Sequence, residues 1–227
     1  MRLGIDWLTD VLISRPGSLI FTGVNGVGKT LLAIQSVCRA LQQGRKCVYA
    51  LTTMAPRTFL EMASSISVDL YGAVEAGRLV IVDIHTRGEP GQLARYSVSP
   101  ESSLLQIREA LLVAAEGERG YLQVIDDIST LLAYTPSEPA FKFYQGIAAD
   151  LRRNDATGIA IIVPEILEPK LTNLLNSLSD GVVEMLLEEM GGNLRRFVRI
   201  RFLRGVRHPT EMLEFQIGAR GIELLTD

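Results

Sequence analysis

The sequence predicts an α/β fold, in which helices flank a mostly parallel central sheet and an antiparallel β extension follows at the C-terminus. Two observations predict it. Between residues 18 and 164, short apolar runs rich in Val, Ile and Leu alternate with segments of helical apolar spacing, which is the pattern of repeated β-α-β units. After residue 179, apolar and polar residues alternate on both sides of a Gly-Gly-Asn turn, as in a hairpin.

Five strands are expected in the parallel part, because each run is short, bounded by turn residues and apolar enough to be covered on both faces. They span residues 18–22, 46–51, 79–84, 122–126 and 158–163. Apolar residues at helical spacing predict helices between them, at residues 29–43, 102–115 and 141–151. We interpret the apolar stripes of the last two helices as packing faces.

The C-terminal extension is predicted from the segment DGVVEMLLEEMGGNLRRFVRIRFLRG, followed by the short runs MLEFQI and IELL. Residues 86–100 form a long segment without apolar periodicity, and such loops are usually mobile or functional. There is no internal repeat, linker or low-complexity segment. We therefore expect one domain rather than a double-domain arrangement.

Composition narrows the classes of function. The formal net charge of -3 gives no dense positive field, so binding to nucleic acid through bulk charge is not expected. Asp6 and Asp10 interrupt the N-terminal apolar segment, which therefore does not resemble a signal peptide, and no apolar run approaches the ~20 residues of a membrane span. We expect a soluble, cytoplasmic protein without membrane insertion. Cys38 and Cys47 are interpreted as reduced, buried core residues, although pairing is possible in principle.

The stretch GVNGVGKT, residues 23–30, matches the full pattern G-x-x-x-x-G-K-[ST] between an expected strand and an expected helix. Glycines let the backbone approach phosphate closely, so that successive N–H groups and the helix dipole face the anion. Lys29 is expected to reach the β- and γ-phosphates of ATP, and Thr30 to bind Mg²⁺. A glycine turn that merely joins strand and helix is the alternative, but it leaves the Lys-Thr pair unexplained. The expected nucleotide-binding residues of this segment are Gly23, Val24, Asn25, Gly26, Val27, Gly28, Lys29, Thr30 and Leu31.

An acidic residue at the end of a later strand should hold the Mg²⁺ through water. Asp126 is the candidate, because it is the first carboxylate after the apolar pair Val124-Ile125. Alone, an aspartate at a strand end would more often cap a turn. Together with the glycine loop, the metal-binding interpretation is favoured.

Several segments resemble the single-domain KaiC-like ATPases of the RecA superfamily. GIDWLTDVL, PGSLIFTGVNGVGKT, VIDDISTL, DGVVEML and FLRGVRHP occur in the order and approximate spacing of that family, over nearly the whole chain. The resemblance implies a RecA-like phosphate-loop fold, formed by residues 1–227 as a single nucleotide-binding domain. Within the superfamily, YALTTMAPRTFLEMASSISVDL is most similar to FlaH, the archaellum motor-associated protein, whose second strand ends in a Thr-Thr pair. FlaH has a glutamate directly after that pair, where this chain has Met54.

The resemblance also exposes a difference that bears on hydrolysis. KaiC-like enzymes end the second strand in two glutamates, one of which polarises the attacking water, and the aligned residues here are Thr52 and Thr53. A threonine hydroxyl cannot act as a general base near neutral pH. Asp127 and Glu165 remain as candidate catalytic carboxylates beside Lys29, although Asp127 is shorter than glutamate and Glu165 is also compatible with a plain surface residue. The sequence thus favours weak or partner-dependent hydrolysis.

The segment RFLRGVRHP resembles the KaiC segment in which a lysine and an arginine reach the phosphates bound by the neighbouring subunit. Arg204 matches the arginine and Phe202 occupies the lysine position, while His208 matches a histidine near the nucleotide. Arg201 and Arg207 flank this site. The alternative for these arginines is a solvated strand face, because basic and apolar residues alternate here as they would on an exposed edge. The resemblance implies a homo-oligomer, a hexameric ring, with Arg204 as a catalytic residue acting across the interface.

Three functions are compatible with these residues. The first is an ATP-dependent assembly or regulatory subunit of a larger protein machine such as an archaellum motor. The second is a KaiC-like signalling ATPase or autokinase, which the missing glutamates and the lack of a second domain disfavour. The third is a RecA-type DNA-pairing protein, which the net charge and the absence of an Arg/Gly-rich loop disfavour.

Overall fold

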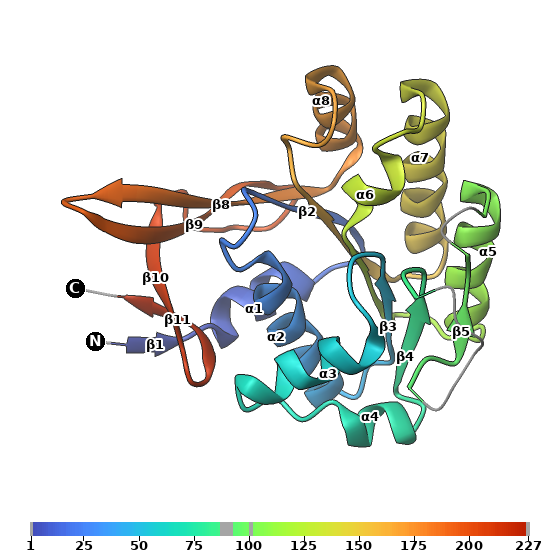
Figure 1. Ribbon diagram of the computed structural model, residues 1–227, viewed down its shortest axis with the longest axis horizontal. Coiled ribbons are helices and arrows are strands. Elements are labelled where there is room, and N and C mark those ends of the chain that lie inside the picture. Colours follow the sequence, from blue (N-terminus) through green and yellow to red (C-terminus); the bar gives the residue numbers. More distant parts are fainter. Residues whose placement is uncertain (1, 87–92, 100–101, 226–227) are drawn as a thin grey trace.

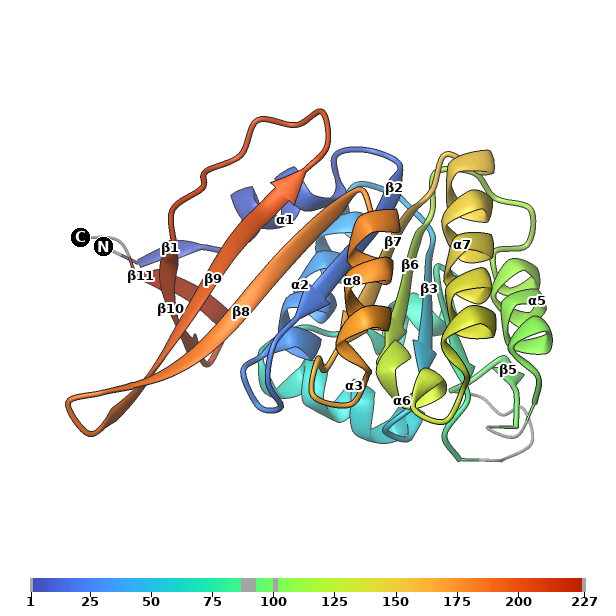
Figure 2. The ribbon, with the colours of Figure 1, turned by 90° about the horizontal axis from the view of Figure 1, so that it is seen from above.

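The computed structural model describes residues 2–86, 93–99 and 102–225. In these residues eleven strands form one sheet with helices on both of its faces (Figures 1 and 2). The sheet order is β1-β11-β10-β9-β8-β2-β7-β6-β3-β4-β5. The α/β fold predicted from the alternation of apolar runs is therefore confirmed.

One half of the sheet is parallel. It contains, in spatial order, β2 (Gly17–Thr22), β7 (Thr157–Ile162), β6 (Leu122–Asp126), β3 (Cys47–Leu51), β4 (Leu79–Asp83) and β5 (Tyr96–Ser97). The five strands expected from the sequence agree with these bounds to within one residue. The short β5 lies in the segment expected to be an irregular loop, of which residues 87–92 and 100 are outside the described residues.

The other half is antiparallel beyond β8 (Gly181–Met190), which still runs parallel to β2. It continues with β9 (Asn193–Leu203), β10 (Leu213–Gly218), β11 (Gly221–Leu225) and β1 (Arg2–Gly4). The hairpin predicted at the Gly-Gly-Asn turn is confirmed, and it projects beyond the rest of the sheet (Figure 2). Because β1 pairs with β11, the first and last strands of the described residues lie side by side (Figure 1).

The helices divide between the two faces of the sheet. On one face lie α1 (Asp6–Ile13), α2 (Lys29–Gln42), α3 (Pro56–Ser65) and α4 (Tyr71–Glu75). The other face carries α5 (Leu104–Ala114), α6 (Ile128–Leu132), α7 (Ser137–Arg153) and α8 (Pro169–Leu178). The three predicted helices correspond to α2, α5 and α7, and most residues of the stripes predicted for the last two pack into the second core, whereas Phe141 is only half-buried. None of the helices in the described ranges is both long enough and apolar enough to cross a bilayer.

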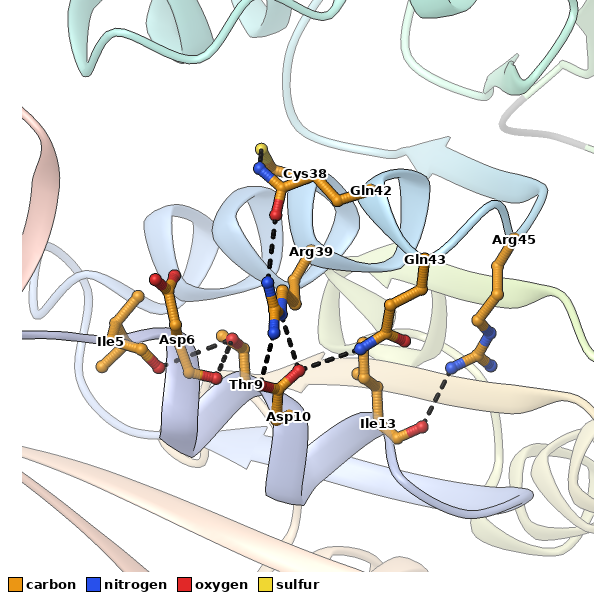
Figure 3. A network of polar contacts seen from close by, with 10 residues as sticks. All are labelled: Ile5, Asp6, Thr9, Asp10, Ile13, Cys38, Arg39, Gln42, Gln43 and Arg45. Carbon is orange, nitrogen blue, oxygen red and sulfur yellow. Dashed lines mark hydrogen bonds and ion pairs between the residues drawn. The ribbon is translucent and has the colours of Figure 1, made fainter.

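Helix α1 docks on α2 through a polar network (Figure 3). The carboxylate of Asp10 accepts hydrogen bonds from Arg39 Nε at 2.6 Å and from Arg39 Nη2 at 2.7 Å, which is the bidentate geometry that suits a guanidinium. Cys38 on the same stretch of α2 is half-buried, so its expected core position is wrong, while Cys47 is buried as expected; both thiols are free. This network attaches the N-terminal segment to the helix that starts at the glycine loop.

Candidate nucleotide-binding site

The candidate site lies at the carboxyl edge of the parallel strands, where β2 passes through the glycine loop into α2 (Figure 2). Gly23 cannot be replaced without rearrangement, because a Cβ there would lie 2.2 Å from the carbonyl oxygen of Met185 on β8. Gly28 has φ 118°, a left-handed conformation that L residues with side chains rarely adopt, and α2 begins at the next residue. The glycine spacing of the loop thus follows from the strand that flanks it and from the helix that leaves it.

The side chain of Lys29 folds back onto the glycine loop and bonds to its backbone. Its Nζ donates hydrogen bonds to the carbonyl oxygens of Gly23 at 2.7 Å and of Val24 at 2.8 Å, and the residue is only 6% exposed. Burial lowers the pKa of Lys29, and the carboxylates of Asp127, Asp126 and Glu165 oppose that shift. The ammonium group therefore lies where several negative charges converge on the loop.

The acidic side of the site begins at the end of β6. Asp126 is 3% exposed, and burial raises the pKa of its carboxyl group to about 6, against hydrogen bonds from Thr30 and Tyr49 that lower it. The hydroxyl of Tyr49 donates to Asp126 Oδ2 at 2.9 Å. Thr30 in the first turn of α2 and Asp126 on β6 are thus brought into contact, as a shared metal site requires. No cluster of three or more His, Cys, Asp or Glu side chains suited to a metal occurs among the described residues.

Asp127 follows directly and is 7% exposed. Its Oδ1 accepts a hydrogen bond from the backbone N–H of Thr130 at 2.7 Å, which caps α6. Capping was the alternative role considered for Asp126 at the end of this strand. The residue that caps the following helix is Asp127 instead. Its carboxyl group also lines the cavity described below.

The two threonines that follow β3 have different surroundings. Thr52 is buried, and its Oγ1 donates to the carbonyl oxygen of Asp127 and accepts from the Asp127 N–H, both at 2.8 Å. Its hydroxyl is therefore used to join the end of β3 to the end of β6. Thr53 is exposed and lines the cavity.

A cavity of about 500 Å³ adjoins the loop, a volume within the range of small-molecule sites. Its lining combines polar residues of the loop and the two carboxylates with apolar side chains. The polar lining residues are Asn25, Gly26, Gly28, Lys29, Thr30, Thr53, Asp126 and Asp127. The remaining lining residues are Leu31, Met62, Ser65, Ile66, Ile161, Val163 and Ile217. A lining that combines charged groups with apolar side chains matches the needs of a phosphate chain attached to an aromatic base.

Most of the nucleotide-binding residues expected from the loop line this cavity. Gly23, Val24 and Val27 are not among its lining residues. Val27 is fully buried in the core, and Val24 is 38% exposed. Glu165 is exposed beyond the end of β7, close enough to Lys29 to affect its pKa. The sequence interpretation did not identify Tyr49 or the apolar wall formed by α3 and β10.

Arg204 and His208 lie at the other edge of the sheet. Because β9 is antiparallel to β8, it ends at the amino edge of the parallel strands, opposite the glycine loop (Figure 2). The Arg204 side chain donates to the carbonyl oxygen of Ser177 at 3.0 Å, lies 3.8 Å from Asp180 Oδ1 and remains 55% exposed. Within one chain these residues therefore do not reach the loop. The alternative of a solvated strand face fits what is seen: β10 pairs with β9 only at residues 196–198, and Arg201, Arg204 and Arg207 are exposed.

A strand, glycine loop and helix with a lysine in the loop, opposite an aspartate at the end of a neighbouring parallel strand, define a phosphate-loop nucleotide-binding protein. The family model described as "ATPase: KaiC" matches residues 3–227. The chain therefore belongs to the KaiC family of ATPases, whose members bind nucleotide.

Three relatives illustrate the similarity. A UPF0273 protein of Thermotoga maritima is 22% identical over 228 residues, which cover 98% of this chain and 94% of that protein. A UPF0273 protein of Aeropyrum pernix is 22% identical over 235 residues, covering 100% of this chain and 94% of that protein. The circadian clock protein KaiC3 of Synechocystis is 19% identical over 215 residues, which are 92% of this chain but 40% of that protein.

Proposed function

We propose that this protein binds ATP with Mg²⁺ in the cavity beside the glycine loop and uses the bound nucleotide to control its own assembly. The convergence of Lys29, Thr30 and Asp126 on one cavity supports the binding step. Met62 and Ile66 in the cavity lining offer an apolar surface for the base. Bound Mg²⁺ would neutralise charge on the β- and γ-phosphates, and Thr30 and Asp126 would hold it directly or through water.

Hydrolysis by the isolated protein is proposed to be slow. The Thr52 hydroxyl is engaged by the backbone of Asp127, so it is not available to orient a water molecule. Asp127 already spends one carboxylate oxygen on the cap of α6. Losing a well-placed general base lowers rates by roughly 10²–10⁴-fold, and a partner that orders Asp127 or Glu165 would restore part of that loss.

The nucleotide is proposed to act across a subunit boundary through Arg204. The Arg204 side chain is half-exposed at the amino edge of the sheet, opposite the glycine loop of its own chain. It cannot contact a nucleotide bound to that loop, but a second copy of the chain could bring its own nucleotide to it. A guanidinium can bind a γ-phosphate bidentately, so this contact would exist only when both ATP and a neighbour are present. The proposed assembly is a homo-oligomeric ring in which each chain forms a single domain. The resemblance to KaiC-like ATPases implies that this ring is a hexamer. His208 would lie at the same interface.

The biological role of the proposed assembly is inferred from the same resemblance. We propose an assembly or regulatory subunit of a multi-protein machine, with the FlaH-type archaellum motor as the leading case, because of the Thr-Thr pair after β3. A signalling ATPase or autokinase is the second candidate, favoured by the relative named as a circadian clock protein. Transfer of labelled phosphate from ATP into the purified protein would favour this second role.

The assembly proposal is tested by light scattering coupled to size-exclusion chromatography, with no nucleotide, with ADP and with Mg-ATP. A coupling free energy of ~1–3 kcal/mol shifts the monomer–oligomer balance roughly 5- to 150-fold per interface. Wild type should assemble with Mg-ATP, and Arg204→Ala should bind ATP without assembling. Arg201→Ala, which changes an exposed arginine near the end of β9, should behave as wild type. A wild type that stays monomeric at tens of micromolar, or an Arg204→Ala variant that assembles normally, would overturn the proposal.

A further inference from the structure

Tyr49 is a fully buried residue in the middle of β3, and its phenolic hydroxyl has a single defined task. The hydroxyl donates to Asp126 Oδ2 at 2.9 Å, while the ring packs against Phe59 of α3 with centroids 4.3 Å apart. Every residue of β3 is buried, so a phenylalanine would satisfy packing at this position equally well. The hydroxyl is therefore to be explained by its partner rather than by the core.

The pairing register brings the two residues together. In the parallel pair of β3 and β6, Tyr49 is opposite Val124 and Leu51 is opposite Asp126. Residues two apart on a strand point to the same face of the sheet, so the side chains of Tyr49 and Asp126 share the face that α2 and α3 cover. Thr30 reaches the same carboxylate from the first turn of α2. Asp126 is thus held from a neighbouring strand and from the helix that leaves the glycine loop.

A carboxylate that binds Mg²⁺ or its water ligands must present one oxygen in a fixed direction. A hydrogen bond to Oδ2 restrains rotation of the Asp126 carboxylate about its Cβ–Cγ bond and leaves Oδ1 without a competing bond from Tyr49. Hydrogen bonds to metal ligands from outside the coordination shell are worth about 10–100-fold in metal affinity. The burial of Tyr49 also excludes water that would otherwise compete for Oδ2.

We propose that Tyr49 is a positioning residue for Mg²⁺, fixing the Asp126 carboxylate in the orientation in which it holds the ion beside the nucleotide. The inference rests on the proposed function, because it requires the metal site of Thr30 and Asp126. It adds to that function a residue that touches neither nucleotide nor metal.

The test is Tyr49→Phe, which removes one oxygen atom and keeps the ring that packs on Phe59. MgCl₂ is titrated into protein with saturating ATP, and the Mg²⁺ dependence of the melting temperature gives the apparent Mg²⁺ affinity. Tyr49→Phe should weaken this affinity about 10–100-fold, while ATP binding measured in EDTA stays at the wild-type level. Tyr144→Phe is the matched control, because Tyr144 is an equally buried tyrosine on α7 that does not line the cavity, and it should not change the affinity for Mg²⁺.

Two further variants separate the hydroxyl from the packing. Phe59→Leu disturbs the ring contact but keeps the hydroxyl, so it should lower the melting temperature and leave the apparent Mg²⁺ affinity unchanged. In an Asp126→Asn background, Tyr49→Phe should have no additional effect on Mg²⁺, since its effect passes through that carboxylate. An unchanged Mg²⁺ affinity in Tyr49→Phe, an equal loss in Phe59→Leu, or an additive loss in the double variant would each overturn the inference. A wild type that shows no Mg²⁺ dependence at all would instead contradict the proposed metal site.

Discussion

Replacing Asp126 by asparagine should stabilise the nucleotide-free protein while removing its response to Mg²⁺. Burial raises the pKa of the Asp126 carboxyl group from its ordinary 3.8 to about 6. The folded protein thus binds this proton more tightly than the unfolded chain does, so the ionised group opposes folding. The opposition is absent below about pH 4, grows as the pH rises towards 6 and is complete above it. Two pKa units correspond to roughly 3 kcal/mol, which is the upper expectation for the gain on substitution.

Asparagine keeps an oxygen that can accept the hydrogen bond from Tyr49, so the substitution mainly removes the buried charge. The assay is urea unfolding of wild type and Asp126→Asn without nucleotide or Mg²⁺, at about pH 4.5 and pH 8. The variant should gain about 1–3 kcal/mol at the higher pH and much less at the lower one. An Asp126→Asn protein that is equally or less stable than wild type at pH 8 would refute the view of Asp126 as a desolvated carboxylate maintained for metal binding.

Two further predictions concern the rate of ATP hydrolysis and the lining of the nucleotide cavity. Steady-state phosphate release by the isolated protein should fall well below the ~1–100 s⁻¹ of typical phosphoryl-transfer enzymes, because neither Thr52 nor Thr53 can act as a general base. If release is fast instead, the variants Asp127→Asn and Glu165→Gln identify the general base, since the one that abolishes release removes it. Ile217→Asp should weaken binding of both ATP and inorganic triphosphate, as measured by calorimetry, because it places a carboxylate beside the phosphate loop, where Ile217 Cδ1 lies 3.6 Å from the position that a Cβ of Gly28 would take. Unchanged binding of triphosphate would show that Ile217 does not face the phosphates.

The parts of the fold that the sequence predicted well are those with local signals. The parallel strands are continuous apolar runs, and the glycine loop ends at Gly28, whose left-handed φ its own backbone geometry demands. The Gly-Gly-Asn turn similarly marks the hairpin between β8 and β9. In each case the residues that determine the structure are adjacent in the sequence.

The remaining features depend on contacts between distant segments. Tyr49 could be connected with Asp126 only through the register of β3 and β6, which no local pattern reveals, although a tyrosine inside a fully apolar strand was a hint that its hydroxyl has a partner. Ile217 reaches the cavity because β10 folds back beside the loop, 187 residues after Thr30 and without any motif of its own. Predicting the position of Arg204 required knowledge of the direction of β9. Because β9 is antiparallel to β8, Arg204 lies at the amino edge of the sheet and not beside the loop.

The central claim, that residues 23–30 bind ATP with Mg²⁺, is tested most directly by thermal and urea unfolding with and without Mg-ATP. At ~100-fold excess of ligand over its dissociation constant, the wild type should gain about 2.7 kcal/mol of stability. Lys29→Ala should lose most of this gain, because the only ammonium group found at the cavity in the described part of the chain is removed. Lys46→Ala, a control at the amino end of β3, should keep it. Unfolding curves of the wild type that do not respond to Mg-ATP, or a Lys29→Ala variant stabilised as much as the wild type, would contradict the account.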